Sequence, residues 1–128
     1  MGLMNEPNYI LVVEDEKPLN NVLCLKLTHE GYKVDSAFDG EVGLEMIKKN
    51  KYDLVLLDLI TPKMDGFTVL EKLQDKPDLP IIVVLSNLGQ VEDRKRSEDL
   101  GAAGFFIKAD TPLTNVITMV KEQLAEKK

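Results

Sequence analysis

The sequence predicts one α/β domain, a three-layer α/β/α sandwich built around a five-stranded parallel sheet. Three observations lead to this prediction. Short apolar runs of strand length alternate along the chain with segments whose apolar residues recur at helical spacing. Most runs are apolar throughout, which is typical of parallel strands covered by helices on both faces. The length of 128 residues fits a single domain with a core of its own.

The first two strand–helix units come from the N-terminal part of the chain. Tyr9–Val13 is the first predicted strand, and the helix after it has Pro18 in its first turn and ends at Gly31. Lys33–Ala37 is the second strand, and the Asp-Gly pair at residues 39–40 leads into the next helix. The apolar positions expected at helical spacing in these two helices are Leu19, Val22, Leu23, Leu27, Val42, Leu44 and Ile47.

The remaining strands are predicted at Leu54–Leu57, Ile81–Leu85 and Phe105–Ile107. Helices are expected after the Asp-Gly pair at residues 65–66, across Gln90–Leu100, and after the Thr-Pro pair at residues 111–112, which is a good helix start. Their apolar positions are Val69, Leu70, Leu73, Leu113, Val116, Ile117, Val120 and Leu124. One sequence does not reveal strand order, so we expect the flavodoxin-like order 2-1-3-4-5, which is common at this size.

Composition and charge exclude several classes of function. The formal net charge of -6 argues against a nucleic-acid surface on this domain. No apolar run approaches the ~20 residues of a membrane helix, and the N-terminus lacks a signal-peptide pattern. The single cysteine, Cys24, is expected to be a small core residue, and a cytoplasmic location is the default. Residues 1–7 are expected to form a flexible N-terminal tail, and residues 1–128 a single domain.

Polar residues follow four of the predicted strands. They are Glu14-Asp15-Glu16 after the first strand, Asp58 after the third, Ser86 after the fourth and Lys108 after the fifth. Ligands of such sheets bind beyond the carboxyl ends of the strands. Each residue alone has a plain structural explanation, such as a helix cap or a turn. Their convergence on one edge by chance is improbable, and Asp58, at the end of a buried run, needs a partner.

This set of residues suits phosphoryl chemistry with a divalent ion. Clustered carboxylates resist ionisation unless positive charge compensates them. Mg²⁺ binds one or two carboxylates together with waters and phosphate oxygens, and Lys108 can supply a further mobile charge. Asp58 is then the natural nucleophile for a phosphoryl group if it lies centrally.

These residues resemble the receiver domain of two-component response regulators, the family of the chemotaxis response regulator. The resemblance covers nearly the whole chain. It rests on "VVEDE" at 12–16, "LLDLITPKMDG" at 56–66, "VLSN" at 84–87 and "GAAGFFIK" at 101–108, in this order and spacing. Each motif is weak by itself, but the combination is highly specific.

The resemblance implies a role for each matching position. Asp58 matches the phosphoaccepting aspartate. Asp15 would bind Mg²⁺ directly, Glu14 would bind it through water, and Asp58 and the backbone carbonyl of Ile60 would be further ligands. The other matching positions are the hydroxyl Ser86, the phosphoryl-pairing Lys108 and the aromatic switch Phe105.

The resemblance also implies a mechanism and partners. A sensor histidine kinase or phosphotransfer protein would donate a phosphoryl group to Asp58, with Mg²⁺ and Lys108 neutralising charge on the transferred group. Ser86 would then move inward and Phe105 would rotate inward, which changes the surface formed by the fourth helix, fifth strand and fifth helix. A downstream protein or effector domain would read that surface. Such a module is not a turnover enzyme.

The sequence departs from the family's pattern at several positions near the site. Ala109 replaces the usual proline after the lysine, so a trans Lys108–Ala109 bond and a reshaped loop are expected. Asn87 stands where a small residue usually leaves the phosphoryl group accessible; its amide would either bind phosphoryl oxygens or crowd the entrance. Ile60 and Leu88 flank the path of attacking water, and neither can orient it, which predicts a long-lived phosphorylated state.

Three alternatives remain for comparison. A haloacid-dehalogenase-type phosphatase would need an acid two residues after the nucleophile, where Ile60 stands. A flavodoxin-like FMN carrier would need a phosphate loop after the first strand, where Glu14–Glu16 would repel phosphate. A degenerate receiver would serve only as a phosphate-independent docking module, although the residues for the chemistry are present.

Overall fold

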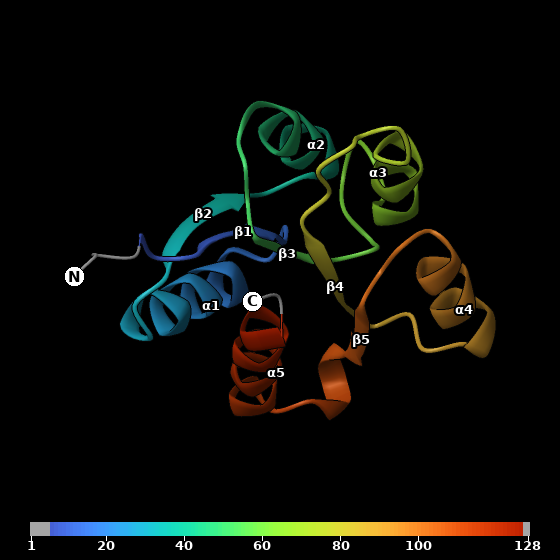
Figure 1. Cartoon of the computed structure of the whole chain (residues 1–128). Coiled ribbons are helices and arrows are strands. Elements are labelled where there is room, and N and C mark those ends of the chain that lie inside the picture. The colour runs from blue at the N-terminus through green and yellow to red at the C-terminus, as the bar shows by residue number, and fades with distance from the viewer. Residues whose placement is uncertain (1–5, 127–128) are drawn as a thin grey trace.

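The computed structural model describes residues 6–126, and its centre is a parallel sheet (Figure 1). The strands are β1 (Tyr9–Val13), β2 (Lys33–Ala37), β3 (Leu54–Leu57), β4 (Ile81–Ser86) and β5 (Gly104–Ile107). They pair in the order β2-β1-β3-β4-β5, with every neighbouring pair parallel. The predicted fold class and strand order are therefore confirmed.

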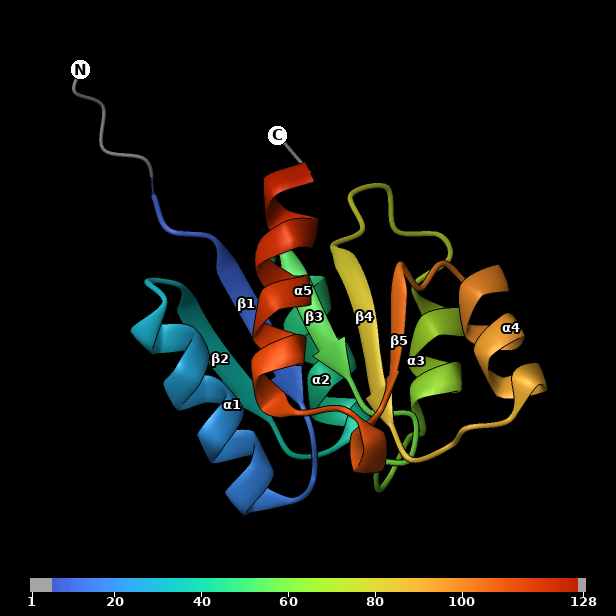
Figure 2. The ribbon, with the colours of Figure 1, turned by 90° about the horizontal axis from the view of Figure 1, so that it is seen from below.

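Helices cover both faces of the sheet. They are α1 (Lys17–His29), α2 (Gly40–Lys49), α3 (Gly66–Lys72), α4 (Val91–Asp99) and α5 (Leu113–Glu126), with a short 3-10 turn, η1 (Lys108–Asp110), before α5. Figure 2 shows α1 and α5 on one face and α2 and α3 on the other. The predicted strands agree with these bounds within one residue, and α4 begins and ends one residue inside the predicted range 90–100. The helix α1 ends at His29, two residues before Gly31, and α5 starts at Leu113, directly after the predicted Thr-Pro pair.

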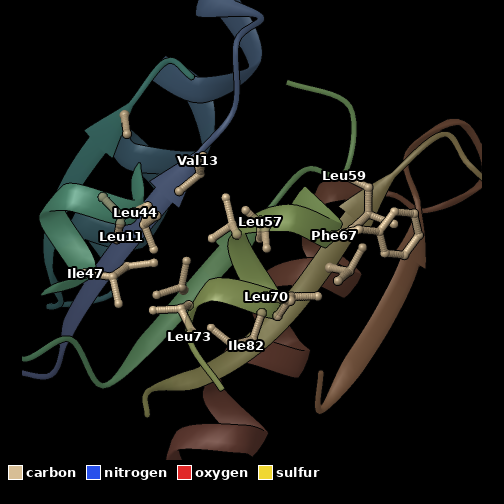
Figure 3. Close-up of a cluster of buried hydrophobic side chains, with 14 of the residues drawn as sticks. Leu11, Val13, Leu44, Ile47, Leu57, Leu59, Phe67, Leu70, Leu73 and Ile82 are labelled. Carbon is tan, nitrogen blue, oxygen red and sulfur yellow. The ribbon is translucent and has the colours of Figure 1, made fainter. Parts of the chain in front are cut away.

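The core consists of two apolar clusters, one on each face of the sheet. Leu11 and Val13 of β1 point into the cluster beneath α2 and α3, which Figure 3 shows together with Leu57 and Leu70. Ile10 and Val12 alternate with them and point into the cluster beneath α1 and α5. Because both faces are covered, β1 and β3 need apolar side chains at nearly every position. This explains why these strands appear as continuous apolar runs in the sequence.

One expectation for α1 needs correction. Val22, placed on the apolar side of this helix by its spacing, is 38% exposed. Asn20 is fully buried instead, on the same side as Leu23 and Leu27. Its amide nitrogen donates hydrogen bonds to the carbonyl oxygens of Glu14 (2.9 Å) and Ala37 (3.3 Å), so the buried polar group is satisfied.

Three smaller expectations concern the N-terminal residues, Cys24 and membrane-spanning helices. Of the predicted tail at residues 1–7, residues 1–5 lie outside the described residues, and Glu6 and Pro7 are exposed before β1. Cys24 is half-buried against the cluster beneath α1 and α5. Within residues 6–126, no helix combines the length and the apolar character that crossing a membrane requires.

Candidate functional site

The carboxyl ends of the central strands bring together the residues that the sequence singles out. Glu14 directly follows β1, Asp58 follows β3 and Lys108 follows β5. These strand ends lie along the lower edge of the sheet in Figure 2. Residues separated by up to 94 positions in the chain therefore meet at one edge, as parallel topology requires.

Asp58 is a buried carboxylate with partners on both oxygens. Its side chain is 4% exposed. Its Oδ1 accepts the backbone N–H of Ile60 at 3.0 Å, and its Oδ2 lies 2.7 Å from the Nζ of Lys108. Its own N–H donates to the carbonyl of Val13 at 3.0 Å, which fixes the chain beside β1. A charge that would be costly in an apolar strand is thus compensated at the strand's end.

Lys108 is the cation that joins the cluster. Its Nζ lies 2.7 Å from Oε1 of Glu14 and 3.2 Å from Oε1 of Glu16, in addition to its contact with Asp58. Burial by itself lowers the pKa of Lys108, but the close contacts of its ammonium with the carboxylates of Asp58 and Glu14 outweigh it. The pKa of Lys108 is therefore raised above that of a free lysine, and the ammonium stays charged at neutral pH.

Glu14 carries negative charge that Lys108 does not fully compensate. Its side chain is 2% exposed, and Oε2 accepts the N–H of Glu16 at 2.9 Å. Oε1 is buried and has no hydrogen-bond partner within residues 6–126, although it forms the ion pair with Lys108. Burial raises the pKa of Glu14 to about 6, and the nearby Asp58 charge adds to this effect. The site therefore favours a second positive charge.

The donor set fits a small, hard divalent cation. Glu14, Asp15 and Asp58 each place one carboxylate oxygen so that these atoms all lie within 4.8 Å of one another. Mg²⁺ prefers oxygen ligands and keeps several waters, which the exposed Asp15 side of the cluster allows. A cation bound there would offset the cost of burying the Glu14 charge and the repulsion from Asp58, which together raise the pKa of Glu14.

A small open cavity lies over Asp58. Its volume is about 220 Å³, and it is lined by Asp15, Glu16, Asp58, Ile60, Asn87 and Lys108. A larger groove of about 450 Å³ lies between α1 and α5, and the carboxylate cluster is not part of its lining. We place the candidate site at the smaller cavity because carboxylates and Lys108 line it and because its size suits a phosphoryl group.

Two further predicted residues, Ser86 and Phe105, are not among the residues that line this cavity. Ser86 is fully buried at the end of β4, where its hydroxyl accepts the N–H of Leu88 at 3.4 Å, and it is not among the lining residues. Phe105 is 7% exposed, with the guanidinium of Arg94 5.7 Å from its ring centre.

Residues 6–126 contain no cis peptide bond, which confirms the trans Lys108–Ala109 bond.

Sequence reasoning missed the contribution of Asn20. By binding the carbonyls of Glu14 and Ala37, its side chain holds the ends of β1 and β2 together directly beneath the acidic residues. The available signal was the spacing of Asn20, which stands three residues before Leu23 and seven before Leu27 and so lies on the same side of the helix. It indicated a buried asparagine but not which carbonyls it binds.

Comparison with known proteins agrees with the resemblance to receiver domains over most of the chain. A family model described as response regulator receiver domain matches residues 10–120. The chain is 41% identical over 103 residues to a probable transcriptional regulator ycf27 of Porphyridium aerugineum, covering 80% of this chain and 42% of that protein. It is 37% identical over 99 residues to the response regulator ArlR of Staphylococcus aureus, covering 77% of this chain and 45% of that protein. The chain thus spans less than half the length of these two relatives.

Solved structures agree in fold. The receiver domain of the Francisella response regulator 1452 superposes with a TM-score of 0.88 at 25% identity, covering 94% of this chain and 99% of that one. A CheY-like receiver domain protein from Methanospirillum hungatei gives a TM-score of 0.87 at 26% identity, covering 94% and 95%.

Proposed function

Because the chain belongs to the response regulator receiver domain family, whose members are signalling modules of two-component systems, we propose that Asp58 accepts a phosphoryl group from a sensor kinase or phosphotransfer protein. The main support is the position of this carboxylate. It is buried at the carboxyl edge of β3, paired with Lys108 and adjacent to Glu14 and Asp15. A structural carboxylate would need Lys108, but it would not need two further acids beside it.

The proposed step is an in-line displacement at phosphorus. An oxygen of Asp58 forms the new P–O bond, while the P–N bond of the donor phosphohistidine breaks and its electron pair returns to the imidazole. Lys108 neutralises negative charge on the phosphoryl oxygens, and Glu14 and Asp15 would hold Mg²⁺, aided by the Ile60 carbonyl. Bound there, Mg²⁺ would supply further charge neutralisation for the same oxygens.

The phosphorylated state would then be read at a protein surface. We propose that the acyl phosphate attracts the hydroxyl of Ser86 and stabilises the buried position of Phe105 seen in the structure. A change in that equilibrium alters the surface of α4, β5 and α5 for a downstream protein or an effector domain. The acidic net charge fits protein partners in the cytoplasm better than direct contact with nucleic acid.

The alternatives are less well supported by the geometry. A dehalogenase-type phosphatase would carry its general acid at the position of Ile60. This residue is apolar, and its backbone N–H donates a hydrogen bond to Asp58. Glu14 to Glu16 stand where an FMN carrier would bind phosphate. A receiver that serves only as a docking surface would not need the cluster of Glu14, Asp15 and Asp58.

Phosphorylation with a small donor tests the proposal. After incubation with acetyl phosphate and Mg²⁺, intact-mass measurement is expected to show one added phosphoryl group on the wild type and none on Asp58→Asn. Chelation of Mg²⁺ should also prevent the reaction. Asp75→Asn, a matched change at an exposed aspartate far from the cluster, should behave like the wild type. A wild type that stays unmodified, or an Asp58→Asn variant that is modified equally, would contradict the proposal.

The lifetime of the phosphorylated state gives a second prediction. Ile60 lines the cavity and is 55% exposed, and Leu88 is half-buried beside Ser86. Neither side chain can hold an attacking water, so the acyl phosphate is expected to decay slowly. Leu88→Glu should accelerate decay by about tenfold or more by positioning that water. The loss of the phosphoryl mass after removal of the donor measures both rates, and Leu88→Met serves as a control of similar size. Fast decay in the wild type would disprove this explanation.

A further inference from the structure

Asn87 connects the two loops that border the cavity. It directly follows Ser86 at the end of β4, and it is one of the residues that line the cavity, together with Asp58 and Lys108. Its side-chain oxygen accepts the backbone N–H of Ala109 at 3.1 Å. Ala109 is the residue after Lys108, so this hydrogen bond joins the end of β4 to the turn that carries the lysine.

The chemistry of the two groups fixes the orientation of the Asn87 carboxamide. A backbone N–H can only be met by an acceptor, so the atom that faces Ala109 must be the oxygen and not the nitrogen. The NH₂ group therefore points away from Ala109, and it forms no hydrogen bond within residues 6–126. It remains available to an anion in the cavity that Asn87 lines.

The turn at Ala109 has few other restraints. Both Ala109 and Asp110 are exposed, and η1 is only three residues long. The backbone hydrogen bond that closes this turn, from the N–H of Thr111 to the carbonyl of Lys108, is long at 3.5 Å. The bond from Asn87 is thus a principal restraint on the backbone next to Lys108, whose ammonium must reach both Glu14 and Asp58 at 2.7 Å.

We propose that Asn87 is a positioning residue for Lys108: through the N–H of Ala109 it holds the turn in the conformation that aims the ammonium at the phosphoryl site. This proposal rests on the proposed function of Asp58. It requires that residue 109 has an N–H, and a proline at that position would remove it. Asn87→Ala and Ala109→Pro should therefore break the same interaction from its two ends.

A double-mutant cycle tests the proposal. Each single variant is expected to lower the saturating rate of phosphorylation by acetyl phosphate by about fivefold, the value of one hydrogen bond. The double variant should be no slower than Asn87→Ala, since either change removes the whole bond. Asn115→Ala, at an exposed asparagine of α5, is the matched control and should match the wild type. If the two losses multiply, or if Ala109→Pro leaves the rate unchanged, the proposal is wrong.

Amide hydrogen exchange tests the same bond without a proline. In the wild type, the Ala109 amide should exchange about fivefold or more slowly than in Asn87→Ala, while the exchange of the Asp110 amide stays the same. Equal exchange of Ala109 in both proteins would overturn the proposal. A failure of the proposed function looks different, because the wild type itself would then not be phosphorylated at Asp58.

Discussion

Replacement of Lys108 by methionine is expected to slow phosphorylation of Asp58 by about 100-fold or more, the usual cost of removing one group that stabilises transition-state charge. Methionine keeps much of the length of the side chain but not the ammonium that contacts Asp58 and Glu14 at 2.7 Å. The rate of mass increase with acetyl phosphate at saturating Mg²⁺ measures the effect.

The same change should destabilise the protein in metal-free buffer. It leaves the buried carboxylates of Glu14 and Asp58 without their cation, which should lower the free energy of unfolding by about 3 kcal/mol. Glu14 has a folded-state pKa of about 6, raised chiefly by burial, so its charge is costly above pH 6 and the cost falls as Glu14 is protonated. The stability difference from the wild type should therefore be larger at pH 8 than at pH 5.

Two comparisons separate this effect from a general loss of charge. Saturating Mg²⁺ should recover part of the stability of Lys108→Met, because a bound cation neutralises the same carboxylates. Lys63→Met removes an exposed lysine that lies 4.0 Å from Asp39, and it should change neither property by much. Denaturation that is independent of both pH and Mg²⁺ in Lys108→Met would show that the cluster is not electrostatically strained.

The sequence was sufficient to predict the residues of the cluster because parallel topology determines where strand ends meet. Once Val13, Leu57 and Ile107 are recognised as strand ends, the residues after them must share an edge. The apolar runs and the positions of glycine and proline were therefore enough to predict most of the fold. The buried place of Asn20, and the exposure of Val22, depended instead on which helical side faces β1 and β2.

Contacts between loops could not be predicted from the sequence, for a different reason. Asn87 and Ala109 were each noted as departures from the family's pattern, but nothing in the sequence connects two residues 22 positions apart in different loops. Their hydrogen bond depends on loop conformations that apolar periodicity does not determine. The buried position of Phe105 and the approach of Arg94 to its ring likewise depend on side-chain packing around β5 and α4.

Alanine at Gly66 is expected to lower the free energy of unfolding by about 3 kcal/mol, at the upper end of overpacking effects. Gly66 is the first residue of α3, after the capping residue Asp65, and its N–H binds the carbonyl of Leu59 at 2.9 Å. A Cβ atom there would lie 2.7 Å from the carbonyl oxygen of Asp58 and 2.8 Å from the Cα of Leu59. Both are backbone atoms, so the loop that carries Asp58 must move.

The displacement should also reach the site, which distinguishes it from simple destabilisation. Because Asp58 and the Ile60 carbonyl belong to the displaced loop, Gly66→Ala should weaken Mg²⁺ binding even below its melting temperature, as titration calorimetry would show. Gly104→Ala is the matched control: its Cβ would meet Val83 at an ordinary 3.6 Å, and alanine reduces the entropy of the unfolded chain. Since the two changes add the same atom, a difference between them is expected from the close approach of α3 to the loop that carries Asp58. Equal melting temperatures and equal Mg²⁺ affinities would mean that this loop has room to yield.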